Sequence, residues 1–271
     1  MRLRRLIGDF IRKRNPLDIE QIEIPVKAKS SLRIAHVSDV HIPRCAFSPR
    51  EIADSVQKQM PDVIFLTGDV MDRRTHFCAP RISLLLALLL EIAPVYAISG
   101  NHERGNSEYY KIWETMLTLR GVHFVDEKVA RFEKAGTTFV IVGMRDINLK
   151  RDLVYDFSFL SEITVADDEC YLLLHHRPSI WRDVYPPDAP MPEVVFSGHA
   201  HGGQIRIPFT NRGLVAPNQG LFPKYTSGLY RHPRGSYEVV SRGLASVTNP
   251  IRINNRPHIP IVELISNNFE E

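Results

Sequence analysis

Five apolar stretches of this chain each run directly into polar residues of the types that bind metal ions in proteins. The residues at these five ends are Asp39 and His41, Asp69, Asn101 with His102 and Glu103, His175 with His176, and His199 with His201. In open α/β sheets, ligands bind outside the carboxyl ends of the strands. We therefore expect the apolar stretches to be strands of such a fold and their polar ends to converge on one crevice.

The spacing of apolar residues predicts strands that alternate with helices in the first part of the chain. Strands are expected over residues 32–37, 62–67 and 95–98, with helices over 49–60 and 80–93 between them. This alternation predicts βαβ units and a largely parallel sheet in an α/β domain. Further strand-like runs follow at residues 138–142, 171–174, 193–196, 204–207, 237–240 and 259–264. We expect one catalytic domain over residues 30–268, preceded by a polar linker and containing a long loop rich in Pro, Gly and Asn over 208–236.

The N-terminal segment is predicted to form a separate basic amphipathic helix over residues 1–16. Its apolar residues recur at helical spacing, and residues 1–14 carry six cations against Asp9. The whole chain has a net charge of +3, so this local +5 leaves about −2 for the remainder. Such a helix either lies in an anionic membrane surface or packs its apolar face on the domain. The body is a poor surface for polyanions, so no nucleic acid partner is expected.

Cysteine content and hydropathy favour a cytoplasmic protein. The three cysteines are widely spaced and include no CxxC motif, which argues against a disulfide framework. The longest apolar run, residues 84–93, is far shorter than the roughly 20 residues that span a bilayer. The N-terminus also lacks the uninterrupted apolar region of a signal peptide. We expect cytoplasmic residence, peripheral on the cytoplasmic face of the membrane where the N-terminal helix binds lipid.

The polar ends differ in how strongly each one indicates a metal site. An Asp and a His two residues apart are common by chance, and Gly-Asp after a strand is often a turn. The segment Gly198-His-Ala-His-Gly-Gly is more specific, because solvated turns seldom use imidazole. Carboxylates, imidazoles and one carboxamide without thiolate suit manganese, iron or zinc. The ligands are too many for one ion, and paired ions about 3.5–4 Å apart suit in-line displacement at phosphorus.

The order of these motifs resembles the calcineurin-like metallophosphoesterase superfamily. The motifs are Asp39-x-His41, Gly68-Asp69-x-x-Asp72-Arg73, Gly100-Asn101-His102-Glu103, His176, and Gly198-His199-x-His201. The resemblance covers residues 32 to about 207 and implies two facing mixed β-sheets flanked by helices. Segments near 241–244 and 255–259 are similar to a bacterial branch whose members often carry a membrane segment before the catalytic domain. This chain departs from that branch, since it has only the basic amphipathic stretch.

The resemblance also implies a role for each motif residue. One metal ion would take Asp39, His41 and His201, and the other would take Asn101, His176 and His199, with Asp69 bridging both. A hydroxide shared by the two ions would attack phosphorus, and such ions make hydroxide available near neutral pH. His102 would protonate the leaving oxygen, oriented by Asp72, while Arg73 would bind a phosphate oxygen.

Neighbouring histidines can be ranked against this pattern. The family has His, one residue, then Pro at the fourth strand end, which selects His176 over His175, and successive strand side chains point to opposite faces. His36 is expected to be a core histidine. The remaining four, His76, His123, His232 and His258, are expected at the surface or in loops.

The substrate is less constrained than the reaction. The loop over residues 208–236 combines cations with aromatics that suit either substrate binding or simple anchoring, namely Arg212, Lys224, Arg231, Arg234, Phe222, Tyr225 and Tyr230. A phosphorylated small molecule or lipid is expected, and a membrane-bound N-terminal helix would favour a lipid. One alternative is a pyrophosphatase that acts on a substrate such as UDP-2,3-diacylglucosamine. Another is a non-catalytic scaffold, which the presence of Asp39, Asn101 and His102 disfavours.

Overall fold

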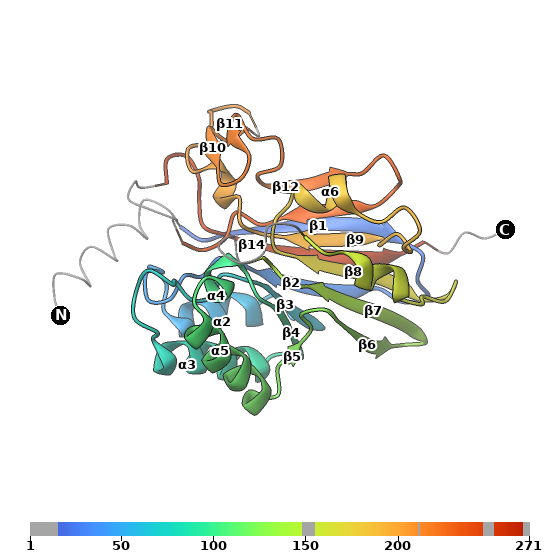
Figure 1. Cartoon of the computed structure of the whole chain (residues 1–271), viewed down its shortest axis with the longest axis horizontal. Helices are drawn as coiled ribbons and strands as arrows, with labels where there is room; N and C mark the ends of the chain where they lie inside the picture. Colours follow the sequence, from blue (N-terminus) through green and yellow to red (C-terminus); the bar gives the residue numbers. More distant parts are fainter. Residues whose placement is uncertain (1–15, 148–154, 211, 246–251, 268–271) are drawn as a thin grey trace.

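Two six-stranded β-sheets lie face to face in the computed structural model, which describes residues 16–147, 155–210, 212–245 and 252–267. Helices cover the outer face of each sheet (Figure 1). The predicted α/β class, with two facing mixed sheets flanked by helices, is confirmed. The predicted helix over residues 1–16 lies outside the described residues except for its last position.

The first sheet contains the three strands predicted near the N-terminus. Its strands, in spatial order, are β1 (Asp18–Val26), β14 (His258–Ser266), β2 (Leu32–Val37), β3 (Val63–Thr67), β4 (Val95–Ile98) and β5 (His123–Phe124). Strands β2 to β5 are parallel, as the alternation with helices predicts, whereas β14 runs antiparallel to β2. The carboxyl ends of β2, β3 and β4 therefore lie side by side at one edge of the sheet.

The second sheet brings the later histidine motifs to the same end of the molecule. Its strands, in spatial order, are β12 (Gly228–Arg231), β13 (Tyr237–Val240), β9 (Val194–Ser197), β8 (Cys170–His175), β7 (Thr137–Met144) and β6 (Lys128–Lys134). Strands β7, β8, β9 and β13 are parallel, and β6 and β12 are antiparallel edge strands. The polar ends of β8 and β9 consequently face those of β2, β3 and β4.

Successive side chains of each strand point to opposite faces of the sheet, and this alternation builds three apolar layers. In β3, Ile64 and Leu66 face the helices α2 (Pro49–Gln57), α3 (Ala79–Leu90) and α5 (Ser107–Arg120), whereas Phe65 points between the sheets. In β8, Leu172 likewise points between the sheets, and Leu173 faces the outer layer that contains α6 (Ile180–Val184). Within the described ranges, no helix is long and apolar enough to cross a bilayer.

Three sequence-based expectations for secondary structure were wrong in part. The predicted polar linker contains β1, in which Ile22, Ile24 and Val26 are buried while the intervening residues stay in contact with solvent. This period-two pattern indicates an edge strand, and the sheet therefore begins before residue 30. Residues 204–207 make only isolated bridges, Ile205 to Ile253 and Arg206 to Gly213, instead of a strand. The predicted loop over 208–236 contains a two-stranded ribbon, β10 (Val215–Ala216) and β11 (Gly220–Leu221), and the edge strand β12.

We predict that the interface between the two sheets dominates stability. Phe65 is fully buried there and packs edge-on against Tyr96 and against Phe196 of the second sheet. Phe65→Ala should lower the free energy of unfolding by about 3–5 kcal/mol, because it leaves a cavity between the sheets. Urea denaturation measures the change. Phe209→Ala, at a fully exposed position, should change it by no more than about 0.5 kcal/mol; equal effects would contradict this packing.

Candidate active site

The turns that follow the strands hold their polar residues in unusual backbone conformations. Asp39, His41, Asp69, His199 and His201 all have positive φ, between 48° and 64°. Non-glycine residues rarely adopt this left-handed region, and such strain gathers at functional sites. The turns therefore determine the directions of these five side chains. The surrounding structure must stabilise the strained backbone of each turn.

Close contact between two of these turns requires glycine. Gly68 has φ +91°, and a Cβ atom there would lie 2.6 Å from the backbone of Gly100. The ends of β3 and β4 thus touch through two glycines, with Glu103 in α4 (Asn101–Arg104) joining them. Its carboxylate accepts hydrogen bonds from the backbone N–H groups of Asp69 and Gly100 at 2.8 Å and of Met71 at 3.0 Å. Burial raises the pKa of Glu103 to about 7, and its role is to fix the two turns together.

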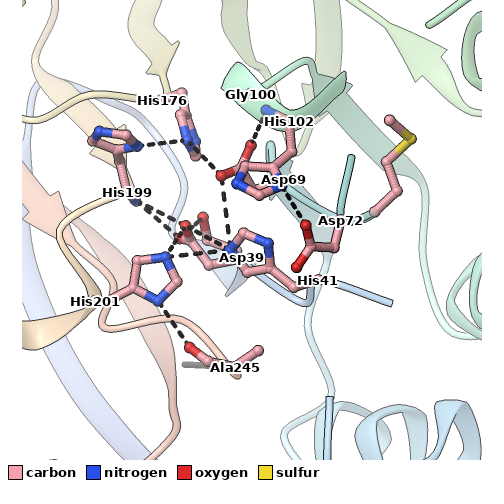
Figure 2. Close-up of polar contacts among 12 residues, drawn as sticks. Asp39, His41, Asp69, Asp72, Gly100, His102, His176, His199, His201 and Ala245 are labelled. Atoms are coloured by element: carbon pink, nitrogen blue, oxygen red, sulfur yellow. Dashed lines mark hydrogen bonds and ion pairs between the residues drawn. The ribbon is translucent and has the colours of Figure 1, made fainter. Parts of the chain in front are cut away.

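The first cluster of metal-binding groups joins the ends of β2 and β9. His201 Nε2 lies 3.0 Å from Asp39 Oδ1 and 3.3 Å from His41 Nε2 (Figure 2). His201 Nδ1 lies 2.8 Å from the carbonyl oxygen of Ala245. A carbonyl oxygen only accepts, so Nδ1 carries the proton and Nε2 presents a lone pair to His41.

The second cluster joins the ends of β3, β8 and β9. His176 Nε2 lies 3.4 Å from Asp69 Oδ2 and 3.2 Å from His199 Nδ1 (Figure 2). His176 Nδ1 donates to the carbonyl oxygen of Thr67 at 2.7 Å, so its Nε2 carries a lone pair when the ring is neutral. His199 Nε2 lies 2.7 Å from Asn218 Oδ1, and donation to this oxygen leaves His199 Nδ1 as a lone pair as well.

These lone pairs have a direct consequence for what the clusters can bind. In the second cluster, two ring nitrogens point lone pairs at each other from 3.2 Å, beside a carboxylate. Such an arrangement is repulsive unless a proton or a cation lies among the groups. His41 Nε2 lies 3.7 Å from Asp69 Oδ2, so Asp69 adjoins both clusters. The donor atoms thus fit two cations that share one carboxylate.

The ionisation of the clusters agrees with cation binding. Burial lowers the pKa of His41 to about 4 and that of His199 to about 3, so both are neutral at physiological pH. Neutral imidazole is the form that binds metal. Burial also opposes the charged form of His176, but the Asp69 carboxylate raises the pKa of that ring to about 10. A proton at this position therefore competes with a cation for the same electron pair.

Asn101 lies at the end of β4, beside the clusters. Its Oδ1 atom is buried and has no hydrogen-bond partner among the described residues. Asn101 also lines a cavity of about 220 Å³ beside the clusters, together with Asp69, His102, His199 and His201. A buried carbonyl oxygen without a donor is costly, and a cation in the cavity would satisfy it.

His102 lies beside the clusters but is held by a separate acid. Its Nδ1 lies 3.0 Å from Asp72 Oδ1 (Figure 2). Arg44 Nη1 and Arg74 Nε donate to the same carboxylate at 2.7 and 3.0 Å. Burial alone would raise the pKa of Asp72, but the bonds from His102 and Arg74 hold it far below its usual value. Asp72 thus stays ionised and orients the ring.

A cation that the sequence analysis missed forms another wall of the cavity. Arg177 is 1% exposed, and its Nε donates to both oxygens of Asp146 at 3.0 Å. Its Nη1 donates to Asn218 Oδ1 at 2.9 Å, whereas its Nη2 is buried without a partner in the described part of the chain. The available signal was its position, directly after His176. Arg73 also lines the cavity, as a phosphate-binding role requires.

The other histidines divide as expected with one exception. His175 turns away from the clusters, packs against Tyr155 and Phe157, and bonds the carbonyl oxygen of Arg177. His36 is a buried core residue 2.8 Å from Thr67 Oγ1. The prediction for His258 was wrong: it is fully buried in β14, 2.8 Å from Glu20, because β14 lies inside the sheet between β1 and β2. His76 and His123 are exposed and His232 is half-buried.

Comparisons with known proteins agree with this geometry. A family model described as calcineurin-like phosphoesterase matches residues 32–203. The chain is 28% identical to the metallophosphoesterase YkoQ of Bacillus subtilis, over 91% of this chain and 88% of that protein. It is 29% identical to the phosphodiesterase YaeI of Escherichia coli, over 86% of this chain and 82% of that protein.

More distant relatives include a membrane protein and a solved structure. The transmembrane protein with metallophosphoesterase domain of Danio rerio is 25% identical, over 92% of this chain and 57% of that protein. The NAD nucleotidase of Haemophilus influenzae superposes with a TM-score of 0.53 at 14% identity, over 82% of this chain and 46% of that chain. At this identity the superposition supports the shared fold alone.

We predict that Mn²⁺ stabilises the folded protein through the two clusters. A saturating ion at about 100 times its dissociation constant adds about 2.7 kcal/mol, which raises the melting temperature. His176→Ala should remove most of this rise, since it takes a donor from the second cluster. Calorimetry with and without EDTA measures it. The neighbouring His175→Ala is the control and should keep the Mn²⁺-dependent rise; loss in both variants would contradict the assignment of donors.

Proposed function

Because this chain belongs to the calcineurin-like phosphoesterase family, a family of metal-dependent phosphoester hydrolases, we propose that it cleaves a phosphate ester or pyrophosphate of a lipid-linked substrate. The observation that carries the proposal is the pair of buried clusters whose lone pairs and carboxylates converge. Clusters of this kind suit cations, and paired cations suit displacement at phosphorus.

Seven side chains would hold the two divalent cations. One set comprises Asp39, His41 and His201, and the other comprises Asn101, His176 and His199, with Asp69 shared between them. The contacts of Asp69 with rings of both sets support its bridging position. Mixed oxygen and nitrogen donors without thiolate favour manganese, with iron or zinc as alternatives. When bound, the cations would supply a water of lowered pKa and offset charge on the phosphoryl oxygens.

His102 is the proposed general acid for the leaving oxygen. Its Nδ1 lies 3.0 Å from Asp72 Oδ1 and accepts a hydrogen bond from the backbone N–H of Arg73 at 3.2 Å, and its ring lines the cavity. A histidine is suited to proton transfer near neutral pH. The Asp72 carboxylate orients the ring, and Arg44 and Arg74 prevent that carboxylate from turning away.

Two cations of the chain itself are placed to bind phosphate oxygens. Arg177 lines the cavity, its Nε and Nη1 are fixed by Asp146 and Asn218, and its buried Nη2 has no partner among the described residues. Arg73 also lines the cavity, and its backbone contacts His102. Charge-assisted bonds from guanidinium to phosphate are among the strongest hydrogen bonds in proteins. Arg177 would contribute an oriented donor at little entropic cost.

A lipid-linked substrate is supported by two observations. Residues 1–14 carry six cations among regularly spaced apolar residues, which suits an anionic membrane surface. A related protein of Danio rerio is named as a transmembrane protein with this domain. We infer that the chain acts peripherally, on the cytoplasmic face of the membrane, on phosphate groups that protrude from lipid.

We predict that Asn101→Ala and His102→Ala each lower turnover of bis-p-nitrophenyl phosphate at least about a hundredfold, through loss of a cation ligand or of the general acid. The exposed His76→Ala is the matched control and should retain normal turnover. Metal content, measured on the same preparations, should fall for Asn101→Ala and stay unchanged for His102→Ala. Near-normal turnover in both variants would overturn the proposed roles.

A second prediction concerns phosphate recognition by Arg177. Arg177→Lys keeps the positive charge but loses the planar guanidinium group with its fixed N–H donors. Inorganic phosphate should therefore inhibit hydrolysis about tenfold more weakly. The Mn²⁺-dependent rise in melting temperature should persist, which separates this effect from loss of the clusters. Arg131 lies on β6 and forms an exposed hydrogen-bonded pair with Glu169. Arg131→Lys is therefore the control. Unchanged phosphate inhibition in Arg177→Lys would remove this residue from substrate binding.

A further inference from the structure

A small lobe projects from the molecule between β9 and β13. We define the β10–β11 lobe as residues 205–210 and 212–226; β10 and β11 pair at its centre, and it stands apart from both sheets (Figure 1). Backbone bonds tie its parts together, from Leu214 N–H to Ile205 O at 2.8 Å and from Phe222 N–H to Leu214 O at 2.9 Å. It is therefore an ordered unit that presents its side chains in fixed positions.

Several exposed side chains of this lobe are large and apolar. Phe209 is fully exposed, Leu221 is 71% exposed and Phe222 is 63% exposed. Val215 pairs directly with Leu221 across the ribbon, so their side chains share one face. Single exposed apolar residues are ordinary, but a group of large ones marks a surface that meets another apolar medium.

The segment of the chain that contains the lobe carries charge of a single sign. Residues 194–237 contain five cations and no Asp or Glu. Two of these cations, Arg212 and Lys224, are exposed on the lobe itself. Apolar side chains that project among cations match a lipid surface with anionic head groups, where rings enter the acyl boundary and cations stay at the phosphates. An acidic protein surface would match the cations alone and leave the phenylalanines unexplained.

The inner side of the lobe is a wall of the catalytic cavity. Pro217 and Asn218 line that cavity. Asn218 Oδ1 accepts from His199 and from Arg177, so the loop that joins β10 to β11 is bonded directly to the site. If this protein docked on another surface through the lobe, its catalytic cavity would thus lie next to that surface.

We propose that the β10–β11 lobe docks the protein on anionic lipid bilayers by inserting Phe209, Leu221 and Phe222. The docking would present phosphate groups of membrane lipids to the cavity, and this consequence rests on the proposed function. The docking itself does not depend on catalysis. It is also distinct from any contribution of residues 1–14, because the lobe belongs to the second half of the chain.

Tryptophan fluorescence in the full-length protein tests the insertion. Trp113 and Trp181 are both fully buried, so a tryptophan placed at position 222 by Phe222→Trp reports on the lobe. Vesicles of phosphatidylglycerol and phosphatidylcholine with brominated acyl chains should quench this fluorophore strongly, and pure phosphatidylcholine vesicles should quench it weakly. Leu119→Trp on α5, at an 81% exposed position, is the matched control and should show no quenching.

A triple variant tests the energetic contribution. Phe209→Ser, Leu221→Ser and Phe222→Ser together should weaken sedimentation with anionic vesicles by about tenfold or more. Hydrolysis of soluble bis-p-nitrophenyl phosphate should stay unchanged. If the unsubstituted protein does not hydrolyse bis-p-nitrophenyl phosphate, that result counts against the proposed function and says nothing against docking.

Several results would overturn the docking proposal. Equal quenching at positions 119 and 222, or none at 222, would show that the lobe does not insert. Full vesicle binding by the triple variant would assign membrane contact to other residues, such as 1–14. A dimer that the triple variant dissociates, without quenching at 222, would identify the lobe as a surface for self-association.

Discussion

Buried imidazole lone pairs that face one another are the constraint on which the rest of this structure depends. His176 and His199 approach to 3.2 Å, and His41 and His201 approach to 3.3 Å, each pair beside a carboxylate. In His176, His199 and His201, a backbone carbonyl oxygen or Asn218 Oδ1 accepts the proton on one ring nitrogen, so the nitrogen that faces the cluster carries a lone pair when the ring is neutral. The fold thereby fixes electron pairs inside the protein that cations satisfy best.

Holding that arrangement requires strain and a supporting layer of bonds. Five of the converging residues have left-handed backbones, which cost free energy at each position. The Glu103 carboxylate binds three backbone N–H groups from the turns after β3 and β4, and Gly68 lets the two turns touch. The apolar layer between the sheets provides the stability that makes such strain tolerable. The geometry of the site therefore depends on the packing of the two sheets.

Charge is arranged in zones around the clusters. Asp39 and Asp69 lie at the centre, where cations would bind, and arginines such as Arg177 and Arg73 line the cavity where phosphate oxygens would lie. Farther out, the β10–β11 lobe adds exposed cations and apolar side chains. The charges therefore favour an anionic group at the cavity, and Asn218 links the lobe to the ligands by hydrogen bonds. Docking, phosphate binding and bond cleavage would share one continuous surface.

The sequence by itself determined the α/β class, the strands that end in polar residues, and the carboxylates and imidazoles that meet in the clusters. These follow from local patterns: apolar period, helix–strand alternation, and residue types at strand ends. It did not determine β1, whose polar alternate residues resemble a linker, or the burial of His258, which depends on where β14 inserts. It also missed Arg177 and Asn218, because an arginine or asparagine in a loop carries no local sign of what it faces. Only the tertiary structure decided these, since burial, tautomers and unpartnered atoms arise when distant segments pack together.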